Sequence, residues 1–131
     1  MGSIAALFAP STASRADARD SGFIAEAFRL RDMAVESGDQ PYGAVVVLDG
    51  SVVGRGPSRV VRDRDHARHA ERVALKDAQD RLGRERLDGA IIYSSSIPCS
   101  TCQPVLARAG IARMVHGRAA LDAGAPRSGE P

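Results

Sequence analysis

The strongest constraint on this chain comes from two short motifs, His69-Ala70-Glu71 and Pro98-Cys99-Ser100-Thr101-Cys102. One imidazole and two thiolates are three zinc ligands, and a site with three protein ligands keeps its fourth tetrahedral position open to water. A fold that uses these residues must therefore bring two distant segments within reach of one Zn²⁺ ion. Glu71 stands two residues after His69, where a carboxylate is placed to move protons for that water.

Other interpretations of the same residues remain open. Cys-x-x-Cys also occurs in redox sites and as half of structural zinc sites. A structural site needs four protein ligands, and in a chain with only two cysteines His66 would have to be the fourth. Glu71 could equally be a solvated helix residue. The joint occurrence of His69, Glu71 and Pro98 with the cysteine pair favours a catalytic zinc site.

Length and composition limit the class of protein. With 131 residues, 26% of them charged, and a net charge of +2, the chain is expected to form one soluble domain. No apolar run approaches the length of a membrane span, and Ile4 to Phe8 is too short for the apolar part of a signal peptide. Two cysteines at metal-ligand spacing fit a reducing compartment, so a cytoplasmic protein is expected.

The first segment of the chain has no sustained hydrophobic period. Residues 1–18 are rich in Ala, Ser, Pro and Thr, which predicts a flexible arm followed by one domain over residues 19–131. Asp20 or Ser21 is expected to cap a first helix that Gly38 ends. The apolar residues of this helix recur at helical spacing: Phe23, Ala27, Leu30 and Ala34, with Ile24 and Phe28 beside them.

A hairpin and a second helix are expected next. The β-branched run from Gly43 to Leu48 predicts a buried strand, Asp49-Gly50 a two-residue turn, and Ser51 to Gly56 the returning strand. The following residues, up to 68, interleave Arg with Asp and predict a loop. A second helix opens at His69 and ends near Gly83.

The second half of the chain alternates strands with a helix. Strands are expected from Ala90 to Ser94 and from Ile111 to His116, and the helix between them begins at Pro98 and ends at Gly110. Strands joined by helices imply parallel pairing, with helices on the faces of the sheet. The predicted fold is a three-layer α/β/α sandwich with a mixed sheet of four to five strands. Both motifs then lie at helix N-termini, whose partial positive charge stabilises thiolates.

From Tyr42 to Gly117 the chain resembles the cytidine deaminase-like superfamily, whose zinc deaminases carry a His-x-Glu and Pro-Cys-x-x-Cys signature. Pro41 to Val47, Gly54 to Arg59 and Ala109 to Gly117 are similar to segments of the branch that holds guanine deaminase, cytosine deaminase and bacterial tRNA adenosine deaminase. Only 14 residues follow Gly117, so the C-terminal segment that covers the substrate in relatives is expected to be short or absent.

The resemblance implies a zinc-dependent hydrolytic deaminase. His69, Cys99 and Cys102 would hold the Zn²⁺, which lowers the pKa of a bound water. Glu71 would take the proton of that water and pass it to the substrate, which releases ammonia.

The resemblance also implies substrate contacts. The backbones of Ala70 and Cys99 would line the reacting centre, and Tyr42 would either form one wall of the pocket or serve only in packing. Ser58 would orient the substrate ring, although relatives usually carry Asn there. Many relatives have Glu at the position of Ile97. We expect a homodimer or larger homo-oligomer, because relatives complete their pockets with a neighbouring subunit.

The expected substrate is a small aminated heterocycle, a free base or nucleoside, with a guanine-type purine slightly ahead of cytosine. One alternative is a tRNA adenosine deaminase, because six arginines precede or surround His69 and could contact phosphates: Arg55, Arg59, Arg62, Arg64, Arg68 and Arg72. Acidic residues interleave with them, and the net charge is small, so neither a nucleic acid nor a membrane is the expected partner. A zinc-stabilised binding protein without catalysis is the other alternative, but such a protein would not need Glu71.

Overall fold

The computed structural model describes residues 12–129. Its elements, in chain order, are the helix α2 (Thr12–Glu36), the strands β1 (Gly43–Leu48) and β2 (Ser51–Pro57), the helix α3 (Ala70–Leu82), the strand β3 (Ile91–Ser94), the helix α4 (Gln103–Arg108), and the strands β4 (Arg113–His116) and β5 (Leu121–Asp122). No helix in this part of the chain is long and apolar enough to cross a membrane.

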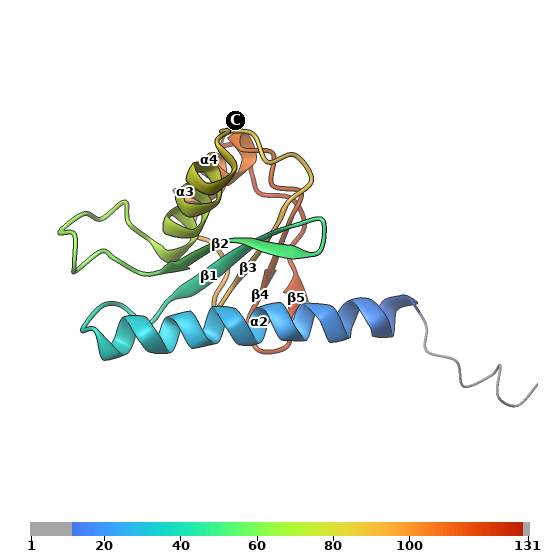
Figure 1. Cartoon of the computed structure of the whole chain (residues 1–131), viewed down its shortest axis with the longest axis horizontal. Coiled ribbons are helices and arrows are strands. Elements are labelled where there is room, and N and C mark those ends of the chain that lie inside the picture. Colours follow the sequence, from blue (N-terminus) through green and yellow to red (C-terminus); the bar gives the residue numbers. More distant parts are fainter. Residues whose placement is uncertain (1–11, 130–131) are drawn as a thin grey trace, which may run out of the picture.

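The five strands form one mixed sheet in the order β2-β1-β3-β4-β5. β1 pairs antiparallel with both β2 and β3, β3 pairs parallel with β4, and β5 pairs antiparallel with β4. Helix α2 covers one face of the sheet, while α3 and α4 lie on the other (Figure 1). The predicted three-layer α/β/α sandwich with a mixed sheet is confirmed.

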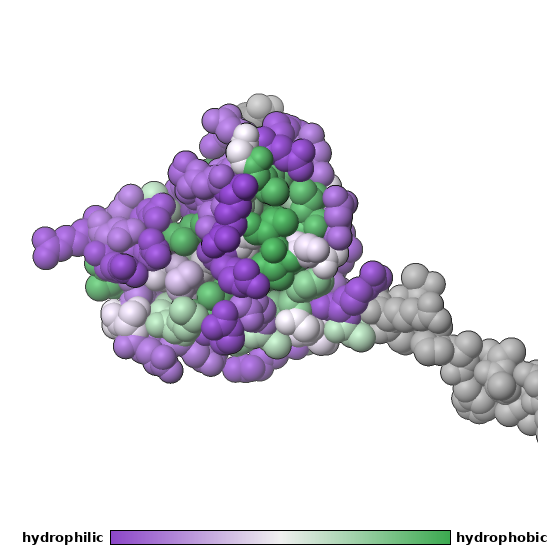
Figure 2. Space-filling model, viewed as in Figure 1, coloured by the Kyte–Doolittle hydropathy of each residue, from purple (hydrophilic) through white to green (hydrophobic). Residues whose placement is uncertain are grey.

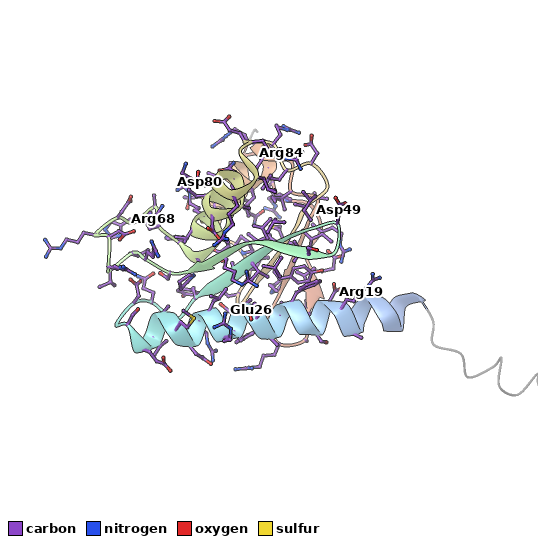
Figure 3. All side chains as sticks on the ribbon, in the orientation of Figure 1. Arg19, Glu26, Asp49, Arg68, Asp80 and Arg84 are labelled. Atoms are coloured by element: carbon purple, nitrogen blue, oxygen red, sulfur yellow. The ribbon has the colours of Figure 1, made fainter. Side chains whose placement is uncertain are left out.

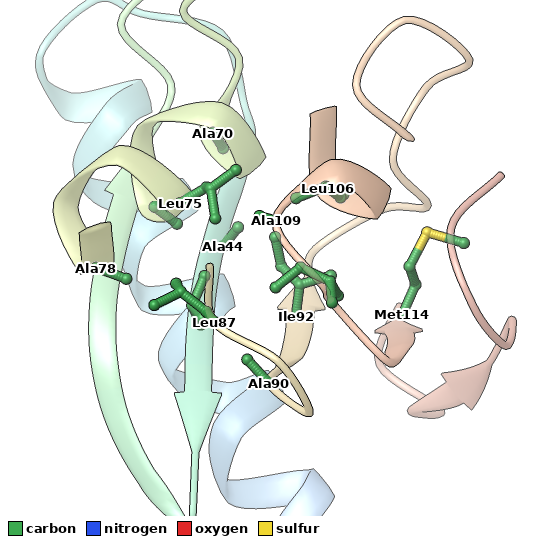
Figure 4. Packing of buried hydrophobic residues seen from close by; sticks show 13 residues of the cluster. Ala44, Ala70, Leu75, Ala78, Leu87, Ala90, Ile92, Leu106, Ala109 and Met114 are labelled. Carbon is green, nitrogen blue, oxygen red and sulfur yellow. The ribbon is translucent and has the colours of Figure 1, made fainter. Parts of the chain in front are cut away.

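Strand β1 separates two hydrophobic cores. Its alternating side chains place Ala44 and Val46 in the core beneath α3 and α4, and Val45 and Val47 in the core beneath α2. The first of these cores joins residues of both helices to β3 and β4 (Figure 4). Because both faces of β1 are covered, the strand is a continuous apolar run rather than an alternating one.

Helix α3 approaches the sheet unusually closely. Gly54 and Gly56 of β2 face it, and a Cβ added at Gly56 would overlap the carbonyl oxygen of Ala70 and the amide nitrogen of Ala74. The helix contributes small side chains, Ala70, Ala74 and Ala78, all fully buried. Small residues on both surfaces therefore fix the position of the helix that follows His69.

The predicted turns around this helix and the hairpin are confirmed. His69 is the N-cap of α3, and Gly83 ends the helix in a left-handed conformation with φ 65° while its amide bonds the carbonyl of Gln79. The hairpin turn places Asp49 at φ 52° and Gly50 at φ 79°. Positive φ at both residues is typical of the type I′ turn that matches the twist of a β-hairpin.

Two predicted helix starts are wrong. Helix α2 begins at Thr12 rather than at Asp20 or Ser21, so residues 12–18 of the expected flexible arm are helical. The reason is local: Ala and Arg have high helix propensity, and no Gly or Pro interrupts residues 12–21. Residues 1–11 of that arm lie outside the described residues.

The second error concerns the helix after β3. It begins at Gln103, and the proline in its first turn is Pro104 rather than Pro98. Residues 100–102 form a turn instead, in which the amides of Cys102 and Gln103 both donate to the carbonyl oxygen of Cys99 at 3.1 Å. This turn is the feature that places the two cysteines.

Candidate metal centre and active site

Three ligand atoms from the two sequence motifs meet between the N-terminal ends of α3 and α4. His69 Nδ1 lies 3.3 Å from Cys102 Sγ and 3.5 Å from Cys99 Sγ, and the two sulfur atoms are 3.4 Å apart. Within residues 12–129, His69, Cys99 and Cys102 are the group of His, Cys, Asp and Glu residues able to hold a metal ion. His66 is not part of this group, which argues against the interpretation as a closed structural site with four protein ligands.

The separations fit a tetrahedral zinc ion. With bonds of about 2.3 Å to sulfur and about 2.05 Å to nitrogen, ligand atoms on such an ion stand about 3.6–3.8 Å apart. The observed 3.3–3.5 Å is slightly shorter and needs only small side-chain adjustments. One imidazole and two thiolates complete three of the four positions.

Hydrogen bonds from neighbouring residues lower the pKa of the Cys99 thiol. Burial raises the pKa of this thiol, but hydrogen bonds from the Thr101 hydroxyl and from the backbone amides of Cys102 and Thr101 outweigh it and lower the pKa to about 6. The Thr101 Oγ1 lies 3.1 Å from Cys99 Sγ. The lowered pKa favours the thiolate of Cys99, the form that binds metal.

Cys102 behaves in the opposite way. It is fully buried, and burial, followed by its contact with Cys99 and the charge of Glu71, raises the pKa of its thiol to about 12. Metal binding must therefore release this proton, which couples zinc affinity to pH.

A residue that the motif analysis missed supports the cysteine turn. Gln103 is buried, its amide nitrogen donates to the carbonyl oxygen of Pro98 at 2.9 Å, and its amide oxygen accepts from the backbone of Arg127 at 3.1 Å. Gln103 thus joins the residue before the first cysteine ligand to the C-terminal segment. Nothing in its sequence surroundings marks this role.

Glu71 lies in the first turn of α3 and is only 5% exposed. Burial raises the pKa of its carboxyl group to about 7, while the charge on His69 and a backbone hydrogen bond oppose this rise. The solvated-helix interpretation of Glu71 is therefore wrong. Burial thus favours the protonated form of this carboxyl group more than in a solvated glutamate.

A small cavity opens beside the three ligands. Its volume is about 230 Å³, and its lining comes from the loop before β1, the start of α3 and the loop after β3: Gln40, Tyr42, His69, Glu71, Ser96, Ile97 and Cys99. The volume suits a single flat heterocycle, since pockets for larger drug-sized molecules are about 300–1,000 Å³. Sequence patterns gave no signal for Gln40 or Ser96, because both are single polar residues in loops.

The three predicted substrate contacts are placed differently from one another. Tyr42 is 41% exposed and lines the cavity. Ala70 is fully buried between His69 and Glu71. Ser58 is buried as well, but it is not among the lining residues, and its hydroxyl donates to Asp39 Oδ1 at 2.9 Å.

The arginine-rich loop between β2 and α3 projects away from the sheet, with Arg68 near its end (Figure 3). Two arginines of this region form ion pairs. Arg68 of the loop pairs with Asp63 at 3.1 Å, and Arg55 of β2 pairs with Glu26 of α2 at 3.1 Å. Arg62 and Arg64 are exposed. The interpretation of this segment as a surface of paired opposite charges therefore applies to Arg55 and Arg68.

The fold and the site together define a class of protein. Residues 17–118 match the family described as the cytidine and deoxycytidylate deaminase zinc-binding region, and the chain belongs to this family. Its cofactor is zinc, and the geometry of His69, Cys99 and Cys102 agrees with that assignment.

Two relatives illustrate the similarity. A tRNA-specific adenosine deaminase of Agrobacterium fabrum is 38% identical over 96 residues, which make up 73% of this chain and 63% of that protein. The guanine deaminase of Bacillus subtilis is 37% identical over 81 residues, which make up 61% of this chain and 52% of that protein. The match thus covers only part of each relative.

Two solved structures are similar to the same extent. A structure from work on A-to-I editing by tRNA:A34 deaminases has a TM-score of 0.70 and 36% identity, covering 72% of this chain and 73% of that one. The Bacillus subtilis guanine deaminase structure also has a TM-score of 0.70, with 32% identity, covering 73% of this chain and 62% of that one.

Proposed function

We propose that this protein is a hydrolytic deaminase that replaces the exocyclic amine of a purine ring with oxygen and releases ammonia. One observation carries the proposal: the buried carboxyl group of Glu71 and two of the metal ligands, His69 and Cys99, line the same small cavity. A redox or structural Cys-x-x-Cys site has no need of a buried acid in such a position.

His69, Cys99 and Cys102 would hold the zinc ion, which when bound supplies Lewis-acid activation of a water molecule. Glu71 would take one proton from the attacking water and deliver it to a ring nitrogen. It would then take the remaining proton from the newly added hydroxyl group and deliver it to the departing amine. Oxygen bonds to the ring carbon as the carbon–nitrogen bond breaks, so water and the amine become a carbonyl and ammonia. Tyr42 and Ile97 form apolar walls that keep the ring flat against the reacting groups.

Adenosine in tRNA is the first substrate to test, because several curated relatives carry that name. The expectation that small free bases rank above tRNA adenosine is therefore not supported. Exposed Arg62 and Arg64 on the loop before α3 are available for phosphates.

A free guanine-type purine is the second candidate. The Bacillus subtilis guanine deaminase has nearly the same identity and the same TM-score as the tRNA-related matches. The 230 Å³ cavity accepts one base in either case and does not distinguish a free base from one presented by RNA.

Ammonia release tests the proposal. The zinc-loaded protein is assayed under one set of conditions with guanine, 2,6-diaminopurine, adenosine, cytosine, cytidine and an anticodon stem-loop RNA that carries adenosine. The product of 2,6-diaminopurine is informative, because loss of the 6-amine gives guanine and loss of the 2-amine gives isoguanine. Release from purine substrates supports the proposal, and release from the pyrimidines alone contradicts it.

Glu71→Gln is the matched control, because the amide keeps the shape of the side chain but cannot shuttle protons. We expect it to retain zinc and fold while turnover falls by about 10²–10⁴-fold. If this variant keeps a substantial part of the activity, the proton shuttle is another group.

We also propose a homodimer or larger homo-oligomer in the cytoplasm. Figure 2 shows an apolar area beside the hydrophilic outer surface of α3, and Leu82 at the end of this helix is 39% exposed. Strand β2 also leaves one edge of the sheet open. Burying such surfaces against a second copy would remove them from water.

A further inference from the structure

We propose that Gln40 and Ser96 determine specificity, by hydrogen-bonding the imidazole part of the purine ring, which does not react. This inference rests on the proposed purine deamination and names the residues that select its substrate. Neither residue belongs to the metal-binding motifs, and each comes from a different loop at the rim of the cavity.

The first support is that the residues lining the cavity differ in the chemistry of their side chains. His69 and Cys99 are ligands, Glu71 moves protons, and Tyr42 and Ile97 offer mainly apolar surface. Apart from the phenol hydroxyl of Tyr42, Gln40 and Ser96 carry the neutral hydrogen-bonding groups among the lining residues.

The residue expected to orient the ring is not free to do so. The hydroxyl of Ser58 donates to Asp39 Oδ1 at 2.9 Å, and its amide donates to the carbonyl oxygen of Tyr42 at 3.0 Å. Ser58 is also absent from the cavity lining. A polar purine edge therefore needs other partners, since an unpaired buried polar group is costly.

Asp39 holds the backbone of Gln40 in place. Its Oδ1 accepts from the Gln40 amide at 2.8 Å, and its Oδ2 accepts from the Arg62 amide at 2.8 Å, so two loops are joined through one carboxylate. The carbonyl oxygen of Gln40 accepts from the Tyr42 amide at 2.8 Å. Among the hydrogen bonds of residues 12–129, none uses the Gln40 carboxamide. The residue thus has a fixed backbone and a free side chain.

Ser96 is placed next to the same loop. The preceding residue, Ser95, donates its amide to the carbonyl oxygen of Gly43 at 2.9 Å, and its hydroxyl accepts from the Gly43 amide at 3.1 Å. These two bonds fix the loop after β3 to the start of β1, directly beyond Tyr42. Gln40 and Ser96 therefore face one cavity from two segments that are tied together.

The chemistry of the two side chains matches a purine. Adenine and guanine both carry the ring acceptor N7, to which an amide can donate. A carboxamide has two donors and a hydroxyl can donate or accept, so Gln40 donates to a ring nitrogen while Ser96 adapts to the neighbouring group.

The test measures binding without turnover. In the zinc-loaded full chain carrying Glu71→Gln, affinities are measured by calorimetry for 2,6-diaminopurine and for a stem-loop RNA with adenosine in its loop. The same RNA with an abasic nucleotide at that position removes the phosphate contribution. Gln40→Ala, Ser96→Ala and Gln40→Glu are compared with the controls Gln79→Ala and Ser51→Ala, which lie outside the cavity.

We expect Gln40→Ala and Ser96→Ala each to weaken base binding by about 3- to 10-fold, the loss of one neutral hydrogen bond. Gln40→Glu should bind more weakly than Gln40→Ala, because a carboxylate repels an acceptor nitrogen, and the controls should stay within about twofold. Unchanged affinity in both alanine variants overturns the inference. So does tight binding by Gln40→Glu, or the failure of the Glu71→Gln protein without further changes to bind either 2,6-diaminopurine or the stem-loop RNA. If affinities fall as expected but wild-type protein releases no ammonia from any purine, the proposed function fails and the inference stands.

Discussion

Replacing Gly56 with alanine tests how closely α3 must approach β2 for the metal centre to form. The added Cβ would overlap the Ala70 carbonyl oxygen and the Ala74 amide nitrogen, and would stand 3.0 Å from Ala74 Cα, whereas ordinary contacts begin at 3.4 Å. All three obstacles are backbone atoms, so no side chain can rotate away. The first turn of α3 must therefore shift by roughly 1 Å, and it carries His69 and Glu71 with it.

The size of the effect follows from this displacement. Overpacking a close interface costs about 1–3 kcal/mol, and at about 4 °C per kcal/mol for a domain of this size the Tm should fall by about 4–12 °C. A misplacement of about 1 Å at a catalytic group can cost about 10²-fold in rate. We therefore expect zinc content to fall and ammonia release per folded molecule to drop by about 10²-fold.

Thermal unfolding, elemental analysis for zinc and ammonia release check this prediction. Gly54→Ala is a matched control, because its Cβ would overlap the carbonyl oxygen of Ala74 and stand 2.7 Å from the amide nitrogen and the Cβ of Ala78. These atoms lie one to two turns further from His69 than Ala70 does. It should destabilise the fold with a smaller loss of activity. Gly22→Ala in α2 meets no atom within 4 Å and should stabilise by about 0.5–1 kcal/mol. A Gly56→Ala protein with unchanged Tm, zinc content and turnover would refute the reasoning.

Three further predictions concern the metal, pH and assembly. Cys99→Ala and Cys102→Ala should each lose zinc, with the larger loss of stability for buried Cys102; zinc-free wild-type protein that is folded would overturn the site. Burial raises the pKa of Asp39, but amide hydrogen bonds from Arg62 and Gln40 outweigh it and hold the pKa below 3.8. The ionised form of Asp39 therefore contributes stability above the ordinary pKa of an aspartate, and this contribution is lost as the pH falls through the lowered pKa. Urea unfolding at several pH values should show a smaller acid-induced loss of stability in Asp39→Asn than in the wild type. Sedimentation at micromolar concentration should give at least a dimer, and a monomer mass would contradict the proposed oligomer.

Much of the fold follows from local sequence signals. The run from Gly43 to Leu48, the Asp49-Gly50 turn and the Gly83 helix end each depend on the conformations open to a few adjacent residues, and all three are confirmed. The zinc ligands were also predictable, because imidazole and thiolate chemistry at motif spacing restricts the metal site strongly.

The helix starts show where local signals are insufficient. Capping residues at Asp20 and Ser21 and a proline at Pro98 are all compatible with a helix start. Helix α2 starts earlier, at Thr12, because residues of high helix propensity extend it past the capping candidates. Helix α4 starts later, at Gln103, because a turn precedes it at residues 100–102. The turn before α4 is also the feature that places both cysteines.

The sequence alone predicted the chemistry of the site, because the expected ligands and the expected acid are chosen by residue type and spacing. Only the tertiary structure decided which polar groups face the cavity. Ser58 is hydrogen-bonded to Asp39, while Gln40, from the loop before β1, and Ser96, from the loop after β3, line the cavity. A hydrogen bond between residues 19 positions apart depends on how the loops pack, and no periodicity or motif in either segment encodes it.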